Sequence, residues 1–392
     1  MIKISVIISF RDRDTARLKY CLDSLKNQSF IDFEVIFIDY GSEQEYVIQA
    51  RTLVTSYSFC SYYYVYSQGL PWNRAHAINI GIRLAKADYL LITDIDVIHS
   101  NNHLEVLFKE RKINTSIYNP VYWLKEQFSN YNSIIEGSYI IQKNDYSTIS
   151  KAKGTSHFIS KDVMLEIGGY DEFFCFWGVE DRDLGSRLRK KGIKEHWLDI
   201  GLSPMFHQWH PTVTHEKDSF FPDKWWDDMN IYYQLNIDKI KRNNDDWGQF
   251  INILDRPILK LNEKIFEFEI DKTGTFDKVR VICRIIDELD KLNENECLVI
   301  NIPNEQIKPR IDKIVSLVNV FLEKKLPYLR LDYINRIDRD RYFLPKRDIF
   351  YLIWQLYRIE KKISDIYLNF SNNQQQIKIS NNKKVSFTNT HD

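Results

Sequence analysis

The order of short apolar runs in the N-terminal part of the chain restricts it to a small set of folds. Strand-like, β-branched runs at 4–10 (ISVIISF) and 33–40 (FEVIFIDY) flank a segment, 18–27, whose apolar residues recur at helical spacing. A second helical segment, 74–87, leads into DYLLITDIDVI at 88–98, which is apolar enough for a strand buried on both faces. The order β, α, β, α, β predicts an α/β fold with a mainly parallel, Rossmann-like sheet flanked by helices, in which ligands bind at the carboxyl ends of the strands.

A change in the pattern of apolar and polar residues divides the chain into two parts. Residues 101–151 are polar and predict irregular structure, whereas 160–169 and 180–192 predict helices that end at glycines. Further along, strand-like runs alternate with helical segments, so we expect two domains, residues 1–255 and a smaller α/β domain, residues 256–392, to which we assign no site. In the second domain we expect strands at 264–270, 296–303 and 328–334, helices at 278–292, 311–325 and 347–362, and a frayed hairpin or tail at 372–392.

The composition excludes several classes of protein. Lysine and arginine together number 54, as do aspartate and glutamate, so no overall field attracts the protein to nucleic acid. The five cysteines form no CxxC pair and are odd in number, which disfavours a disulfide framework or a zinc cluster. Without a secretory leader or a run of ~20 apolar residues, the chain is expected to be cytoplasmic. Trp225 and Trp226 would suit a peripheral contact with the inner face of the membrane.

Two carboxylates, Asp94 and Asp96, stand near the end of the third predicted strand. Side chains at i and i+2 of an extended chain point the same way, so both acids are expected to face one pocket. Like charges this close repel unless a cation lies beside them. Mg²⁺ or Mn²⁺ takes one or two protein carboxylates and completes its shell with phosphate oxygens and water, which points to a nucleotide diphosphate. An isolated D-x-D is nevertheless more often a solvated turn.

Other polar clusters accompany this pair. FHQWHP offers His207 and His210 at a spacing that could bring both imidazoles to one metal, and mixed histidine and carboxylate ligation suits Mn²⁺ better than Mg²⁺. WGVEDRD places Glu180, Asp181 and Asp183 in the first turn of a predicted helix. Capping of the helix N-terminus accounts well for one carboxylate there but poorly for three. Tryptophans, which offer flat faces to sugar rings, gather near the expected cleft: Trp72, Trp177, Trp209, Trp225 and Trp226.

These blocks, taken in order, resemble a known family. FRDRDTARLKYCLDSL, WNRAHAINIGIRLAKADYLLITDIDVI and GTSHFISKDVMLEIGGYDEFFCFWGVEDRDLGSRLRKKG are similar to segments of the β-1,4-galactosyltransferases and of the related, family 2-like bacterial transferases of the chondroitin-polymerase type, which have the GT-A fold. The resemblance spans residues 1–215 and leaves the C-terminal part uncovered.

The resemblance implies a metal-dependent, inverting glycosyltransferase. Such an enzyme moves a hexose or N-acetylhexosamine from a nucleotide diphosphate sugar, expected to be UDP-linked, to a glycan, lipid-linked or protein acceptor in polysaccharide or glycoconjugate synthesis. By position, the resemblance assigns nucleotide-sugar contacts to Phe10, Arg11, Arg13, Asp39, Arg74 and Asp94, metal ligation to Asp96 with His207 and His210, acceptor contacts to Trp177 and Glu180, and the catalytic base to Asp181. Val179 departs from the family, which often has a second glycine there, and Tyr40 replaces the second acid that bacterial relatives carry after Asp39.

Two other classes of function stay open. A metal-dependent nucleotidyltransferase or nucleotide-sugar hydrolase could use the same D-x-D, but it would not need the WGxED segment. A carbohydrate-binding protein without catalytic activity would keep the tryptophans and could dispense with metal.

Overall fold

The computed structural model describes most of the N-terminal part of the chain and several segments of the C-terminal part. The described residues are 2–65, 67, 72–175, 178–211, 225–243, 245, 247–249, 262–266, 284–285, 287–289, 291–293, 296–301, 365–371 and 374–380. Contacts within the chain divide it into two compact units, Met1–Ser219 with Lys224–Arg256, and Phe220–Asp223 with Pro257–Asp392.

A seven-stranded sheet forms the centre of the first unit. Its strands, in spatial order, are β10 (Lys194–Trp197), β6 (Thr115–Tyr118), β9 (Ser156–Ser160), β4 (Tyr89–Thr93), β1 (Ile4–Phe10), β2 (Phe33–Asp39) and β3 (Cys60–Tyr64). β1 pairs in parallel with β2 and β4, β2 with β3, and β10 with β6, while β9 runs antiparallel to both of its neighbours. The predicted α/β fold with a mainly parallel sheet is therefore confirmed.

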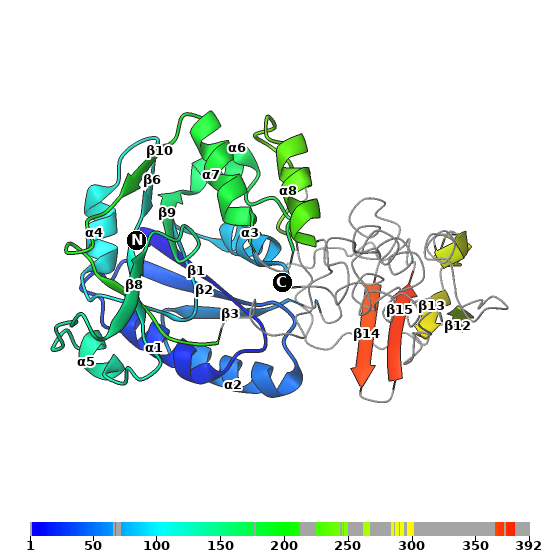
Figure 1. Ribbon diagram of the computed structural model, residues 1–392, viewed down its shortest axis with the longest axis horizontal. Coiled ribbons are helices and arrows are strands. Elements are labelled where there is room, and N and C mark those ends of the chain that lie inside the picture. The colour runs from blue at the N-terminus through cyan, green and yellow to red at the C-terminus, as the bar shows by residue number, and fades with distance from the viewer. Residues whose placement is uncertain are drawn as a thin grey trace, which may run out of the picture. The chain divides into compact units, whose positions relative to one another are not determined.

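Helices cover both faces of this sheet (Figure 1). On one face lie α1 (Thr15–Lys26) and α2 (Gln44–Thr55), and on the other lie α3 (Arg74–Leu84), α6 (Lys161–Ile167) and α7 (Glu180–Lys190). Side chains alternate along a strand, so Val6 and Ile8 of β1 join the core with α1 and α2, whereas Ile7 joins the core with α3. Burial on both faces explains why these strands are continuous apolar runs in the sequence.

A second, four-stranded sheet lies in the same unit. Its order is β5 (Val97–His99), β11 (Met205–His207), β7 (Val121–Leu124) and β8 (Tyr146–Ser150). The single strand expected at 88–98 is therefore wrong: β4 ends at Thr93, and the chain turns through Asp94–Asp96 before β5 enters the second sheet. Apolar Val97 and Ile98 continue the pattern of β4, so the hydrophobic run did not reveal the break.

The expectation of irregular structure at 101–151 is also wrong. This stretch contains α4 (His103–Glu110), β6, β7, α5 (Tyr131–Ile135) and β8. The elements are short, and β8 has three exposed residues in a row because it pairs only with β7 at the edge of its sheet. Short edge strands of this kind carry little hydrophobic periodicity.

The helices predicted at 160–169 and 180–192 are confirmed as α6 and α7. α6 ends at Gly168 in the left-handed conformation (φ +75°), and Gly192 (φ +86°) follows the end of α7. The buried side chain of Arg187 ties α7 to its surroundings, donating to Asp183 Oδ2 at 2.7 Å and to the carbonyl oxygen of Gly169 at 2.8 Å. α8 (Trp225–Leu235) completes the described helices of this unit.

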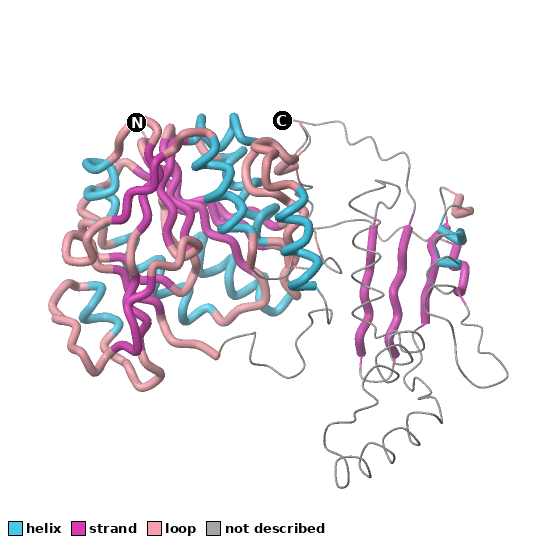
Figure 2. Tube along the Cα trace, turned by 45° about the horizontal axis from the view of Figure 1, so that its top comes forward, coloured by secondary structure: helices cyan, strands magenta, loops and turns pink. Residues whose placement is uncertain are grey.

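The second unit contains a four-stranded sheet (Figure 2). Its order is β12 (Asn262–Phe266), β13 (Glu296–Asn301), β15 (Gln374–Ser380) and β14 (Asp365–Ser371), in which only β12 and β13 are parallel. The strands expected at 264–270 and 296–303 overlap β12 and β13, and β15 occupies part of the expected C-terminal hairpin. Residues 284–285 and 287–289 are helical, within the helix expected at 278–292. The other elements expected here, at 311–325, 328–334 and 347–362, lie outside the described residues.

Two expectations from composition concern the described residues. Cys21 and Cys60 are free thiols, and Cys283 lies outside the described residues. Within the described segments, every helix is too short or too polar to cross a bilayer.

Gly81 lets α3 pack closely on β1. A Cβ on Gly81 would overlap Cγ2 of Ile7, whereas a Cβ on Gly185, within α7, would meet the mobile end of Lys153 at 3.0 Å. Alanine in a helix is favoured over glycine by about 1 kcal/mol, but overpacking a core costs about 1–3 kcal/mol. We therefore expect Gly81→Ala to lower the free energy of unfolding in urea and Gly185→Ala to raise it. Equal stabilisation by both changes would show that α3 is not closely packed on β1.

Candidate active site

The register of the second sheet brings Asp96 and His207 together. β11 lies between β5 and β7, and His207 is the register partner of Val97 on β5 and of Trp123 on β7. Asp96 directly precedes β5, and its carbonyl oxygen accepts a hydrogen bond from the backbone N–H of Gln208 at 2.8 Å. Gln208 is buried and its Nε2 donates to the carbonyl oxygen of Arg17 at 3.0 Å, which anchors the end of β11 to α1.

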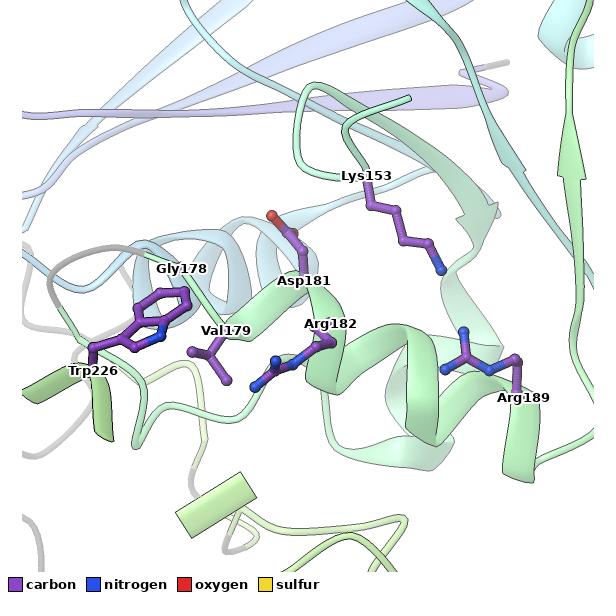
Figure 3. A pocket seen from close by; sticks show the side chains of 7 residues that line it. All are labelled: Lys153, Gly178, Val179, Asp181, Arg182, Arg189 and Trp226. Carbon is purple, nitrogen blue, oxygen red and sulfur yellow. The ribbon is translucent and has the colours of Figure 1, made fainter. Parts of the chain in front are cut away.

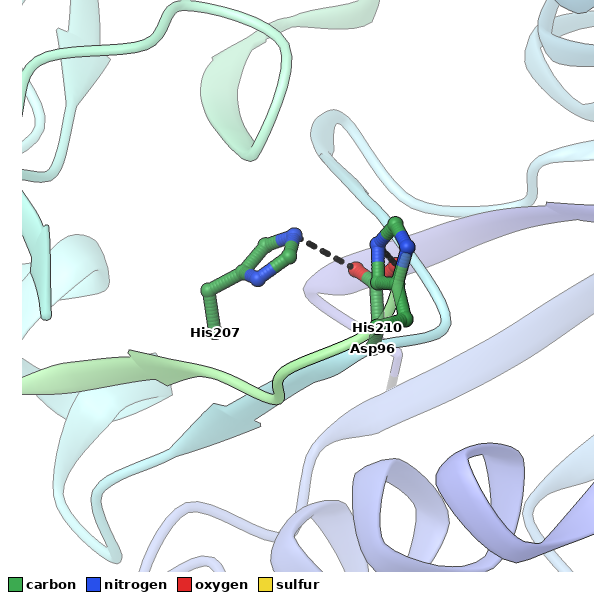
Figure 4. Close-up of side chains that lie close together, drawn as sticks. All are labelled: Asp96, His207 and His210. Atoms are coloured by element: carbon green, nitrogen blue, oxygen red, sulfur yellow. Dashed lines mark ion pairs between the residues drawn. The ribbon is translucent and has the colours of Figure 1, made fainter. Parts of the chain in front are cut away.

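Both imidazoles point at the carboxylate of Asp96 (Figure 4). Nε2 of His207 lies 3.5 Å from Asp96 Oδ1, and Nε2 of His210 lies 3.1 Å from Oδ2. The three ligand atoms lie within 4.8 Å of one another. Nδ1 of His210 donates to the carbonyl oxygen of Pro211 at 2.8 Å, so in the neutral ring Nε2 carries the lone pair. A lone pair that faces a carboxylate is stable only with a proton or a metal ion between them.

The electrostatics of the cluster fit a bound cation. Burial acts to raise the pKa of Asp96, but the charges of His207 and His210 outweigh it and set the pKa at about 2. Burial lowers the pKa of His207, which favours the neutral, ligating imidazole, while the hydrogen bond to Asp96 raises the pKa of His210. Oδ1 of Asp96 is buried and has no hydrogen-bond partner among the described residues. One carboxylate oxygen and two imidazole nitrogens make a donor set that suits Mn²⁺.

Arg74 joins the D-x-D turn to the start of α7. Its Nε and Nη2 donate to Asp94 Oδ1 at 3.2 and 3.0 Å, and its Nη1 donates to Asp181 Oδ1 at 3.2 Å. Arg74 is the first residue of α3, a position fixed by Asn73, whose side chain accepts from the backbone N–H of His76 at 2.9 Å.

The two acids of the D-x-D have different partners. Because Asp94 and Asp96 lie in a turn rather than in a strand, Asp94 faces Arg74 while Asp96 faces the histidines. Burial, with the charges of Asp96 and Asp181, raises the pKa of Asp94 to about 6 against the lowering effect of Arg74. The expectation that an extended chain aims both side chains the same way is therefore wrong, although both acids lie at one site.

The start of α7 is held in an unusual backbone conformation. Val179 directly precedes α7 with φ +71°, a region that β-branched residues rarely adopt. The glycine expected from the family would take this conformation without strain. Glu180 is buried, and burial followed by the charge of Asp181 raises its pKa to about 7, with Arg74 acting in the opposite direction. Gly154 leaves room for Asp181, since a Cβ there would overlap Asp181 Oδ2.

A cavity of about 360 Å³ opens beside Asp181 (Figure 3). Its walls come from the loop before β9, from the start and the last turn of α7, and from α8. They are formed by Lys153, Gly178, Val179, Asp181, Arg182, Arg189 and Trp226. Trp226 packs so closely on Gly178 that a Cβ there would lie 2.9 Å from the indole ring. The cavity combines an aromatic face with three cationic side chains next to Asp181.

The residues expected to contact the nucleotide lie at the ends of β1 and β2. The ring of Phe10 is buried against Phe37, at 5.3 Å between ring centroids, and its carbonyl oxygen accepts from the N–H of Tyr40 at 2.8 Å. Arg13 is exposed, and Arg11 has its Nε 3.6 Å from Asp12 Oδ2.

Asp39 is wholly buried at the end of β2. Its carboxylate accepts from the N–H of Ser42 at 3.0 Å and from the hydroxyl of Tyr62 at 2.6 Å, and burial raises its pKa. Asp39 therefore organises the turn after β2, whatever else it binds.

The tryptophans expected around the cleft have different surroundings. Trp72 packs against the core and meets Tyr40 edge to face at 5.7 Å. Trp209 is 40% exposed and Trp226 is 46% exposed. Trp177 and the side chain of Trp225 lie outside the described residues.

Several residues of the site were missed in the sequence. Trp123 stacks on His207, Gly154 accommodates Asp181, and Lys153, Arg182 and Arg189 line the cavity. VYWL at 121–124 is a β-type run directly after Pro120, and this local signal could have identified β7. Nothing local marks the three cations, because their proximity depends on how α7 packs beside β9.

Comparisons with known proteins show which family the N-terminal part of the chain matches. Residues 5–198 match the family model described as "Glycosyltransferase like family 2". Chondroitin synthase of Pasteurella multocida (strain Pm70) is 26% identical over 260 residues, which cover 55% of this chain and 26% of that protein, so this chain spans about a quarter of that relative's length.

Two solved structures also match. A variant of Drosophila β1,4-galactosyltransferase 7, in complex with manganese, UDP-Gal and xylobiose, is 14% identical, with 58% of this chain and 79% of that chain covered and a TM-score of 0.39. A mannosyltransferase of Pyrobaculum calidifontis, in complex with GDP-Man and Mn²⁺, is 14% identical, with 60% and 62% covered and a TM-score of 0.40.

Residues 5–198 thus form a glycosyltransferase family 2-like domain, which confirms the resemblance found in the sequence.

Metal binding at this cluster should depend on pH through His210. The hydrogen bond to Asp96 raises the pKa of His210, so a proton competes with the metal for Nε2 at any pH below that raised pKa. We expect Mn²⁺ affinity, measured by calorimetry, to fall by about tenfold per pH unit once the pH drops below this pKa, with one proton released per metal bound at low pH. His210→Ala should bind Mn²⁺ more weakly and lose this dependence. A pH-independent affinity of the unaltered protein would contradict ligation by His210.

Proposed function

We propose that residues 1–255 form a metal-dependent, inverting glycosyltransferase that transfers a hexose or N-acetylhexosamine from a nucleotide diphosphate sugar to a hydroxyl acceptor. The observation that carries the proposal is the bridge made by Arg74, which contacts both the D-x-D turn and Asp181. This bridge supports treating the proposed cation site and the proposed base as parts of one site. A family 2-like domain over residues 5–198 supports the same class of reaction.

The donor diphosphate needs positive charge on its leaving oxygen. Asp96, His207 and His210 would hold Mn²⁺ or Mg²⁺, which when bound supplies Lewis-acid stabilisation of the departing nucleoside diphosphate. Arg74 adds a fixed guanidinium beside the same turn, and Asp94 holds that guanidinium in place through two hydrogen bonds. Phe10 at the end of β1, Arg11 and Arg13 directly after it, and Asp39 are assigned to the nucleotide.

The acceptor hydroxyl must lose its proton as it attacks the anomeric carbon. Asp181 is the proposed general base: Arg74 binds its Oδ1, which leaves Oδ2 to accept the proton. Glu180, with a pKa of about 7, is assigned to a hydroxyl of the acceptor. The cavity beside Asp181 is the proposed acceptor site, with Trp226 as a face for a sugar ring and Trp177 as a covering residue.

The finer identity of the substrates follows from the resemblance. We assign a UDP-sugar as donor and a glycan, lipid-linked or protein acceptor, in polysaccharide or glycoconjugate synthesis. The reaction is assigned to the cytoplasm, where thiols stay reduced, and the half-exposed Trp226 at the start of α8 is assigned a contact with the inner membrane face. Residues 256–392 are proposed to be an accessory domain.

Replacing Asp181 should separate catalysis from donor binding. Asp181→Asn keeps an oxygen that accepts from Arg74 but removes the basic carboxylate, so the rate of transfer should fall by ~10²- to 10⁴-fold. Calorimetric binding of Mn²⁺ and UDP should be unchanged. Asp162→Asn, at an exposed acid in the first turn of α6, is the matched control and should retain full activity. Near-normal transfer by Asp181→Asn would refute the assignment of the base.

Measurements of UDP release and of ligand binding distinguish a transferase from the other two classes of protein. UDP-sugars are screened with Mn²⁺, and release of UDP is followed with and without candidate acceptor sugars. Acceptor-dependent release supports transfer, acceptor-independent release at the same rate supports a hydrolase, and sugar binding without nucleotide binding supports a carbohydrate-binding protein.

A further inference from the structure

We propose that Trp123 is a positioning residue for the metal ligand His207: its indole face fixes the plane of the imidazole so that Nε2 points at the cation site. The resemblance assigns Trp123 no role. The inference rests on the metal site of the proposed function, but it concerns binding and requires no knowledge of the sugar substrates.

The contact follows from the register of the second sheet. Trp123 on β7 and His207 on β11 are register partners in a parallel pair, so their side chains project from the same face of the sheet. Their ring centroids lie 4.0 Å apart with 13° between the ring planes, which is a close face-to-face stack. β8 pairs with the other side of β7, so the strand that carries Trp123 is held on both edges.

The two histidines are held in different ways. A metal-ligating histidine is usually oriented by a hydrogen bond from its second ring nitrogen. Nδ1 of His210 makes such a bond, to the carbonyl oxygen of Pro211 at 2.8 Å. Nδ1 of His207 is buried and has no hydrogen-bond partner within the described part of the chain. Rotation of the His207 ring about its Cβ–Cγ bond is therefore restrained by packing, and Trp123 supplies the flat surface on one side.

The indole of Trp123 is itself not oriented by a hydrogen bond. Its Nε1 is buried without a partner among the described residues, as Nδ1 of His207 is. Packing therefore positions each ring: Trp123 packs against the core cluster of Val97, Val121 and Met205 and presents its other contact, the indole face, to His207. Removing the indole should free the imidazole to rotate, and metal binding would then have to restrict that rotation at a cost in affinity.

The first experiment measures Mn²⁺ affinity in the absence of sugars, by calorimetry and by the electron paramagnetic resonance signal of free Mn²⁺. Trp123→Leu should bind Mn²⁺ about 10- to 100-fold more weakly, as is typical when the support of a metal ligand is lost. Trp123→Phe, which keeps an aromatic face, should bind close to the unaltered protein. If the unaltered protein binds Mn²⁺ and Trp123→Leu binds it equally well, the role of Trp123 is refuted and the metal site stands. If the unaltered protein binds none, the metal site itself is refuted.

A double-mutant cycle separates positioning from a general structural role. If Trp123 acts through His207, then Trp123→Leu should weaken Mn²⁺ binding no further once His207→Ala is present. The matched cycle with His210→Ala should be additive, because that ring is oriented by Pro211. Equal additional losses in both backgrounds would show that Trp123 only maintains the fold of the second sheet.

Circular dichroism checks that Trp123→Leu folds. Fluorescence supplies a second readout that uses other variants and so does not depend on the folding of Trp123→Leu. Mn²⁺ is paramagnetic and quenches nearby tryptophan, whereas Mg²⁺ does not, so Mn²⁺ should quench part of the emission of the nine tryptophans. That part should decrease in Trp123→Phe, in which Trp209, between the two histidines in the sequence, is still quenched, and it should be unchanged in Trp197→Phe, a control at the stacked pair of Trp197 and Tyr118 in the large sheet. Undiminished quenching in Trp123→Phe would place the bound ion away from Trp123 and overturn the proposal.

Discussion

The carboxylate of Asp96 is the charge on which the site depends. It lies between the Nε2 atoms of His207 and His210, and its Oδ1 is buried without a hydrogen-bond partner among the described residues. A buried anion without compensation is strongly unfavourable, so this geometry requires either a proton on an imidazole or a cation. In the metal-free protein a proton on His210 compensates the charge of Asp96, which is why the pKa of His210 is raised. A divalent metal ion compensates the same charge when it displaces that proton.

Arg74 transmits this arrangement to the start of α7. The guanidinium contacts Asp94 on one side and Asp181 on the other, and α3 holds it through the cap at Asn73 and the close approach at Gly81. Packing of α3 on β1 therefore determines the distance between the D-x-D turn and the proposed base. The charges alternate across the site, so each acid has a cation beside it and none is isolated.

The sequence predicted those parts of this site whose signals are local. β1, β2 and both helices that end at glycines follow from periodicity, and the joint placement of Asp96, His207 and His210 agrees with the spacing of FHQWHP and the position of the D-x-D. The break after Thr93 was missed because Val97 and Ile98 prolong the apolar run. Trp123 was missed for a different reason: its meeting with His207 depends on the register between β7 and β11, which are distant in the chain and too short to show a period.

Val179, where the family often has glycine, lies in a backbone conformation that glycine would adopt more easily. A β-branched residue at φ +71° stores strain of about 1–3 kcal/mol, which glycine would not. Val179 is buried, and its position in the cavity wall lets side-chain burial offset part of that strain. Glycine would allow this peptide many conformations, whereas valine in contact with its surroundings allows few. The substitution therefore favours a single orientation of Glu180 and Asp181, with Gly154 opposite, in which the proposed base is held ready beside the cavity before any ligand arrives.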